Sequence, residues 1–148
     1  MESKLIFEHD GLKTYVLVYE KGDEFISKLQ GFAEQHALAA SQFTAIGAFS
    51  DAVVGFFDRQ IMDYKKILVK EQVEVLTLVG NITLSENKYK VHAHAVLGKA
   101  DASAIGGHVL EAHVWPTLEV VVEESPKHLL RRQIDPETGL PLLDFRGE

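Results

Sequence analysis

Two apolar runs decide the predicted fold, VEVLTLVGNITL at residues 73–84 and KYKVHAHAVL at residues 88–97. Both are rich in the residue types that strands favour. The turn-like insert Ser85-Glu86-Asn87 lies between them. We therefore expect the two runs to form an antiparallel hairpin.

Further strand-like segments lie on both sides of this hairpin, at residues 13–20, 42–46, 48–57 and 114–122. The second and third are separated by Gly47, where glycine permits a bend or bulge, so a kinked hairpin or a strand pair is expected there. Residues 98–107 are small and predict a loop. The strand after this loop is interrupted early by Pro116.

One helix is predicted, over about residues 24–37, with Asp23 as a plausible N-cap. Apolar and aromatic side chains recur within it at spacings of four, three and four, which places them on one helical face. These positions are Phe25, Leu29, Phe32 and His36. About seven strand-like pieces and one main helix predict an α+β fold with a mainly antiparallel, twisted sheet.

Length and composition indicate a single domain. The chain has 148 residues, a core at about residues 13–124 and a proline-containing tail at 125–148, which we expect to be an extended flap. Cysteine is absent, so thiolate metal sites and cysteine nucleophiles are excluded. The net charge of −7 disfavours nucleic acid as a partner. With no targeting signal and no apolar membrane span visible, we expect a cytoplasmic protein.

The clearest chemical feature is the pair His92 and His94. Alternate residues of a strand point to the same face, so these rings start about 6–7 Å apart. His108 follows Gly106-Gly107, where the chain can return toward the strand it has left. Three converging histidines would form an open Zn²⁺ site. The alternative is a polar surface stripe.

Other polar residues have structural as well as functional interpretations. Glu111 and Glu119 are candidates for a general base beside a metal-bound water, or for a salt bridge or a brace to a histidine. His113 is a candidate fourth ligand, a support for the ligands, or a half-buried strand residue, and we favour the last. The basic run at residues 127–132 indicates a solvated face or an internal charge pair.

Several short motifs together resemble the plant and prokaryote conserved (PPC) domain. In chain order they are Gly47-Ala48-Phe49, LTLVGNI at 76–82, HAHAVLG at 92–98, GGHVLE at 106–111 and PTLEV at 116–120. The resemblance spans about residues 13–124 and implies an α+β subunit assembled as a homotrimer. It also implies that zinc is bound by histidines at the positions of His92, His94 and His108.

The same resemblance brings a DNA-binding label, because plant members of the family follow an AT-hook. This chain has no Arg-Gly-Arg-Pro core, and its nearest approach is Phe145-Arg146-Gly147-Glu148. Minor-groove binding requires inserted basic residues, so the label is in conflict with this acidic chain. The family is also similar in fold to acetolactate decarboxylase, which uses a three-histidine zinc, although a fold alone transfers no activity.

Two functions therefore compete. The first is a PPC-domain homotrimer that acts as a binding or regulatory module. Its zinc site at His92, His94 and His108 would either brace the site or receive a small-molecule ligand. The alternative is a zinc-dependent enzyme acting on a small oxygenated metabolite, with Glu111 as proton carrier. Whether the protein is an enzyme stays open at this point, and no catalytic residue is assigned.

Overall fold

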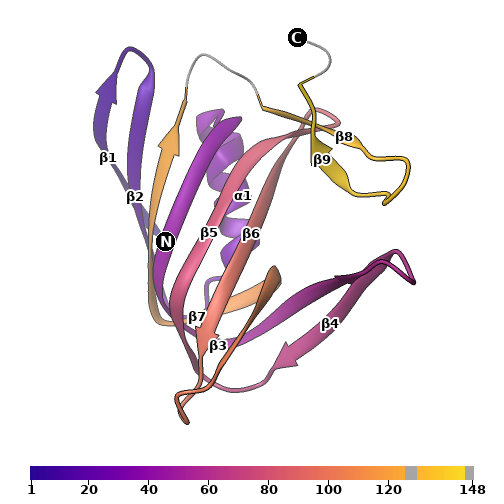
Figure 1. Ribbon diagram of the computed structural model, residues 1–148. Coiled ribbons are helices and arrows are strands. Elements are labelled where there is room, and N and C mark those ends of the chain that lie inside the picture. The colour runs from indigo at the N-terminus through magenta and orange to yellow at the C-terminus, as the bar shows by residue number, and fades with distance from the viewer. Residues whose placement is uncertain (126–129, 146–148) are drawn as a thin grey trace.

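A nine-stranded, mostly antiparallel sheet and one helix make up the computed structural model, which describes residues 1–125 and 130–145 (Figure 1). The predicted α+β class is confirmed, with nine strands in place of about seven. The elements are β1 (Glu2–His9), β2 (Leu12–Tyr19), α1 (Phe25–His36), β3 (Ala40–Asp58), β4 (Asp63–Val69), β5 (Val73–Ser85), β6 (Lys88–Gly98), β7 (Ala104–Glu124), β8 (Arg131–Ile134) and β9 (Pro141–Leu143).

The strand order is β1-β2-β7-β3-β5-β8-β9, with β4 paired to β3. The hairpin predicted from the two apolar runs is β5–β6, paired from Glu74↔Gly98 to Ser85↔Lys88. Strand β6 also pairs with the beginning of β7. Since β7 pairs with β3, and β3 with β5, the four strands close into a ring at this end of the sheet.

Strand β3 corrects one expectation, because residues 40–58 form a single long strand rather than a hairpin or a strand pair. The predicted irregularity at Gly47 is present, as a register shift between Ala45 and Gly47. The φ angle of Gly47 is +145°, and a Cβ there would lie 2.3 Å from the carbonyl oxygen of Thr117. The extra residues at these register shifts lie on β5 and β7, and Gly47 lets β3 pass close to the backbone of β7 at this point without ending the strand.

Helix α1 buries the predicted face, with Phe25, Leu29 and Phe32 in the core. The N-cap is Glu24 rather than Asp23, because the Glu24 carboxylate accepts hydrogen bonds from the backbone N–H groups of Ile26 and Ser27. Asp23 instead forms an ion pair with Lys28 at 3.1 Å.

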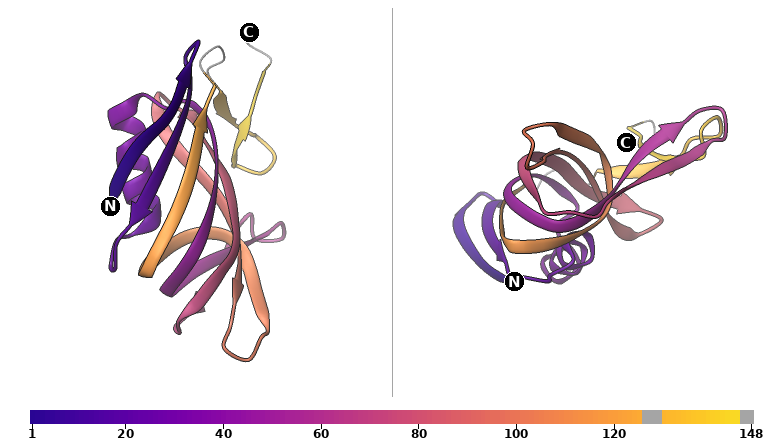
Figure 2. Two further views of the ribbon diagram at one scale, coloured as in Figure 1. Left: turned by 90° about the vertical axis from the view of Figure 1, so that its left-hand side faces the viewer. Right: turned by 90° about the horizontal axis from the view of Figure 1, so that it is seen from below.

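The helix covers one face of the sheet only (Figure 2). Its Phe25 ring packs against Phe43 and Phe49 of β3, with ring centroids 6.1 and 6.3 Å apart. The alternate residues of β6 on this side, such as Ala93 and Ala95, are buried. The other β6 side chains, including His92 and His94, therefore lie on the face opposite α1.

Two hairpins project from the same side of the sheet, β3–β4 and β8–β9 (Figures 1 and 2). The second replaces the extended flap expected for the tail, while residues 126–129 of that tail, within the basic run, lie outside the described residues. The loop expected at 98–107 is shorter, since β6 ends at Gly98 and β7 begins at Ala104. Within residues 1–125 and 130–145, no helix has the length and apolar character that a bilayer crossing requires.

Candidate metal centre

Closure of the strand ring brings the three predicted histidines together. His94 of β6 lies directly opposite His108 in the β6–β7 ladder, and His92 is two residues along on the same face. Each ring offers one nitrogen, and the three nitrogens lie within 4.8 Å of one another. The ring centroids are 5.0 to 5.3 Å apart. The geometry is that of a cluster, not of a polar stripe.

The cluster is partly withdrawn from water, and this determines the charge of its rings. Burial lowers the pKa of His92 to about 4, assisted by the nearby positive charge of Arg132. Burial also lowers the pKa of His108 to about 4, with the neighbouring histidines adding to the effect. Both rings are neutral at pH 7, which is the protonation state that binds a metal ion.

Apart from Nδ1 of His92, the ring nitrogens that the structure describes in the cluster either face one another or have no partner. Nε2 of His92 and Nε2 of His94 face each other at 3.1 Å. Nδ1 of His108 is buried and has no hydrogen-bond partner among the described residues. A buried polar atom without a partner costs free energy, and a bound ion is one of the explanations for it. Three neutral imidazoles facing a common space fit a divalent metal such as zinc.

Two further side chains hold the rings in place. Nη2 of Arg132 donates to Nδ1 of His92 at 3.2 Å. The Tyr64 ring of β4 stacks on His108, with centroids 4.8 Å apart and an interplanar angle of 28°. Gly55 of β3 makes room for this stacking, because a Cβ there would lie 2.7 Å from Cδ1 of Tyr64.

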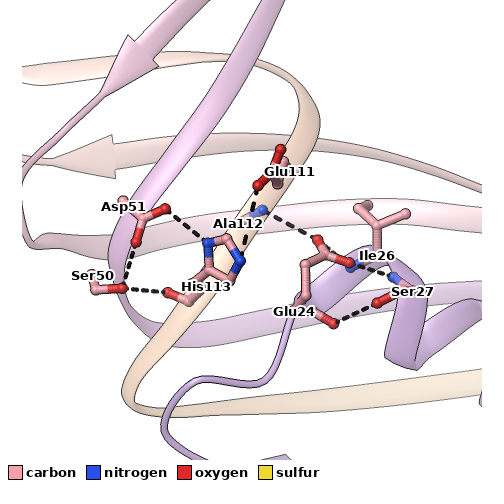
Figure 3. A network of polar contacts seen from close by, with 8 residues as sticks. All are labelled: Glu24, Ile26, Ser27, Ser50, Asp51, Glu111, Ala112 and His113. Carbon is pink, nitrogen blue, oxygen red and sulfur yellow. Dashed lines mark hydrogen bonds and ion pairs between the residues drawn. The ribbon is translucent and has the colours of Figure 1, made fainter.

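Two other candidate residues, His113 and Glu111, are not members of the cluster and take part in a network of polar contacts of their own (Figure 3). His113 pairs through Nδ1 with Asp51 at 2.8 Å, and its Nε2 lies 3.9 Å from Glu111. The hydrogen bond that His113 donates to the Asp51 carboxylate raises the pKa of His113. The structure therefore places Glu111 beside a histidine that belongs to another network.

Figure 3 also shows what this second network does. The Glu24 carboxylate that caps α1 accepts a hydrogen bond from the backbone N–H of Ala112, next to His113. The network thus connects the beginning of the helix to β7. Glu119 is exposed on β7 and lies outside the cluster, so its charge needs neither a salt bridge nor a histidine partner there.

Arg132 and Tyr64 are the site residues that sequence reasoning missed. Arg132 was grouped with a basic run and expected at a solvated face or in a charge pair, yet its side chain is buried, at 8% exposure. Its four hydrogen-bond partners are the neutral groups of Thr83, Asn81, Pro141 and His92. Only the return of the β8–β9 hairpin onto β5 places it there, and the local sequence carries no signal of that return.

The fold and the cluster together define a class: a small α+β domain whose described residues form one helix, with a three-histidine cluster on the sheet face opposite this helix. Residues 7–126 match the Plants and Prokaryotes Conserved (PCC) domain, and the chain belongs to this family. The resemblance noted from the motifs is thereby confirmed.

A curated relative is the bifunctional protein GlmU of Synechococcus sp. (strain JA-3-3Ab), 32% identical over 130 residues. The match covers 86% of this chain and 20% of that protein, so the chain spans about a fifth of its length. Among solved structures, the metal-containing protein AF0104 from Archaeoglobus fulgidus is 32% identical, with a TM-score of 0.83 and coverage of 97% of this chain and 99% of that chain.

A second solved structure, from Bacteroides thetaiotaomicron, is that of a "putative dna binding protein". It is 28% identical, with a TM-score of 0.85 and coverage of 90% and 92% of the two chains. A Staphylococcus aureus protein similar to alpha-acetolactate decarboxylase is 14% identical, with a TM-score of 0.52 over 74% of this chain and 51% of that one. This last likeness concerns the fold alone.

Proposed function

We propose that the protein is a metal-binding PPC subunit that acts as a binding or regulatory module for a small molecule. The observation that carries the proposal is the meeting of three histidine nitrogens within 4.8 Å, contributed by His92, His94 and His108. Two of these rings have a pKa of about 4 and are neutral at pH 7. The metal-containing relative from Archaeoglobus fulgidus, of nearly the same length, supports the same conclusion.

Zinc is the proposed metal. Imidazole nitrogens suit Zn²⁺, and three protein ligands leave one position of a tetrahedral site for water or for a ligand oxygen. In such a site zinc acts as a Lewis acid toward that oxygen. The protein's own part is to keep the rings neutral and oriented, through burial and through the contacts of Arg132 and Tyr64.

Self-association, as a homotrimer, is proposed from the open face of the sheet. Val79 pairs with His94 and therefore shares the face of the cluster. Thr44 pairs with both Val79 and Val121, which places Val121 and Ile46 on that face as well. Several exposed apolar residues lie on this face, and we give the name outer stripe to four of them, Ile46, Val79, Val96 and Val121. Exposed apolar surface of this kind marks an interaction site.

DNA is not the proposed partner. The net charge of −7 opposes a phosphate backbone, and the outer stripe is apolar where a DNA-binding face would be basic. The DNA-binding description belongs to relatives such as the Bacteroides thetaiotaomicron protein. Titration of an A·T-rich duplex at two salt concentrations tests this point, because tight binding with a steep salt dependence would contradict the expectation from charge.

Zinc-dependent catalysis on a small oxygenated metabolite is the alternative function. It is favoured by a cavity of about 100 Å³ beside the cluster, lined by His92 and His108. Against it stands the position of Glu111, which contacts His113 and is not a member of the cluster. A metabolite screen by NMR tests the alternative, since turnover that depends on zinc would place the enzyme ahead of the binding module.

The metal is tested by elemental analysis of protein purified without a histidine tag. We expect close to one zinc per chain in the wild type and none in the His92→Ala/His94→Ala double variant. His9→Ala is the matched control, because His9 is exposed and lies outside the cluster. Circular dichroism checks that the double variant folds. Wild-type protein that stays free of zinc after dialysis against zinc would refute the proposal.

A further inference from the structure

A small cavity of about 100 Å³ lies beside the histidine cluster, between the sheet and the two projecting hairpins. Its walls are formed by Tyr64, Lys90, His92, His108, Arg132 and the segment Leu140–Leu142. The volume is smaller than the roughly 150 Å³ that accommodates a benzene ring. The cavity therefore has room for a compact polar group with few attached atoms.

The charges around the cavity are all of one sign. Lys90 and Arg132 are the ionised side chains of its lining, and no carboxylate is among the described residues that form its walls. The protein as a whole has a net charge of −7, whereas the charged side chains that line this cavity are both positive. Positive groups that converge on a partly closed space attract an anion.

Arg132 is the more informative of the two cations, because its charge is buried and forms no ion pair with a carboxylate in the part of the chain that the structure describes. Its guanidinium donates from Nε to Thr83 at 2.8 Å, from Nη1 to Pro141 at 2.8 Å, and from Nη2 to Asn81 at 2.8 Å and to His92 at 3.2 Å. All four acceptors are neutral. A guanidinium has five N–H donors, so one N–H on Nη1 stays available.

Burying a charge without an opposite charge is costly, and such charges are usually paired. The four neutral acceptors hold the guanidinium in position but do not neutralise it. An anion in the adjacent cavity would supply the missing charge and take the remaining donor. Lys90, exposed at the rim on the same strand face as His92, adds a second positive group.

We infer that this cavity binds the oxyanion group, carboxylate or phosphate, of a small ligand through Arg132 and Lys90. A second oxygen of the same ligand then reaches the histidine cluster, and this part of the inference rests on the proposed metal site. The ligand class is a small organic acid or phosphate ester with a further oxygen close to its anionic group. Arg132 also positions His92, so one side chain joins anion recognition to the cluster.

Methyl NMR on Leu140 and Leu142 tests the inference, because both residues line the cavity. Inorganic phosphate and acetate are titrated separately at constant ionic strength, into protein stripped of metal and into protein incubated with zinc. We expect saturable shifts of both methyl groups with at least one anion. Saturation by phosphate alone identifies a phosphate ligand, and saturation by acetate alone identifies a carboxylate.

Lys90→Met is the informative variant and should weaken anion binding about fivefold. Lys88→Met is its matched control, since Lys88 is also exposed on β6 but does not line the cavity. Arg132→Met should abolish saturable anion binding. If Arg132→Met does not fold, the comparison of Lys90→Met with Lys88→Met still tests the inference. Equal weakening in both lysine variants would overturn it.

Failure of this inference and failure of the metal site are distinguishable. Zinc binding without a saturable response to either anion overturns the oxyanion site and leaves the metal site in place. Anion binding in protein that takes up no zinc supports the oxyanion site while refuting the metal. Absence of both responses overturns both proposals.

Discussion

Replacing Gly47 by alanine is the sharpest test of the close approach between β3 and β7 at this glycine. The new Cβ would lie 2.3 Å from the carbonyl oxygen of Thr117 and 2.8 Å from Cα of Leu118. Both atoms belong to the backbone of the neighbouring strand, where Gly47 pairs with Leu118, so neither can move without disturbing the ladder. The φ angle of +145° adds strain for any residue with a Cβ.

The expected loss of stability has two contributions, the strained backbone conformation and the close contacts of the added Cβ. Holding a non-glycine residue in such a backbone conformation costs about 1–3 kcal/mol. Forcing an extra carbon into a packed position costs about 1–3 kcal/mol more. Gly47→Ala should therefore lower the free energy of unfolding by roughly 2–6 kcal/mol, a large part of the 5–15 kcal/mol that a typical domain has.

Urea unfolding followed by circular dichroism measures this difference, at one protein concentration for all variants because assembly affects stability. Gly31→Ala is the matched control, since Gly31 lies on the exposed side of α1, where an added Cβ would have no other atom within 4 Å. That change should raise stability by about 0.5–1 kcal/mol. A Gly47→Ala protein within about 0.5 kcal/mol of the wild type would refute the steric reasoning.

Two further predictions concern the second network and the outer stripe. Asp51→Asn should lower the pKa of His113, measured by NMR titration, and an unchanged pKa would show that the 2.8 Å contact is absent in solution. The pair raises the pKa of His113 above 6.5 and lowers that of Asp51 below 3.8. Its contribution to the stability of the folded protein is therefore fully present between pH 3.8 and pH 6.5. It is lost as pH rises through the folded-state pKa of His113 or falls through that of Asp51. Ile46→Glu should dissociate the assembly in light scattering, whereas Ile6→Glu, of similar exposure on β1, should not; the reverse result would place the interface elsewhere.

The part of the fold that could be predicted is the part with strong local patterns. The β5–β6 hairpin has long apolar runs and a turn between them, and the face of α1 follows from the spacing of Phe25, Leu29 and Phe32. Strand β1 was missed because all eight of its residues are exposed. It therefore lacks the alternation of apolar and polar residues that a half-buried strand shows. Strand β4 was missed for a similar reason, since only Val69 of its seven residues is buried.

The residues of the candidate site also differ in whether a local sequence pattern could predict them. His92 and His94 were predictable because a strand fixes which side chains share a face, and His108 because glycines precede it where the chain turns back. Arg132 depends on a contact between segments about fifty residues apart in sequence, such as its hydrogen bond to Thr83. No local periodicity reports such a contact, and a run of basic residues more often indicates exposure.

Because His94 pairs with His108, the proposed metal site depends on the register between β6 and β7. A slip of one residue between β6 and β7 would turn His108 toward the helix side and dismantle the cluster. An ion that requires all three rings is accordingly selective for chains whose strands are aligned correctly. We therefore expect that the proposed metal, added during refolding, binds only those chains in which β6 and β7 have paired in the native register.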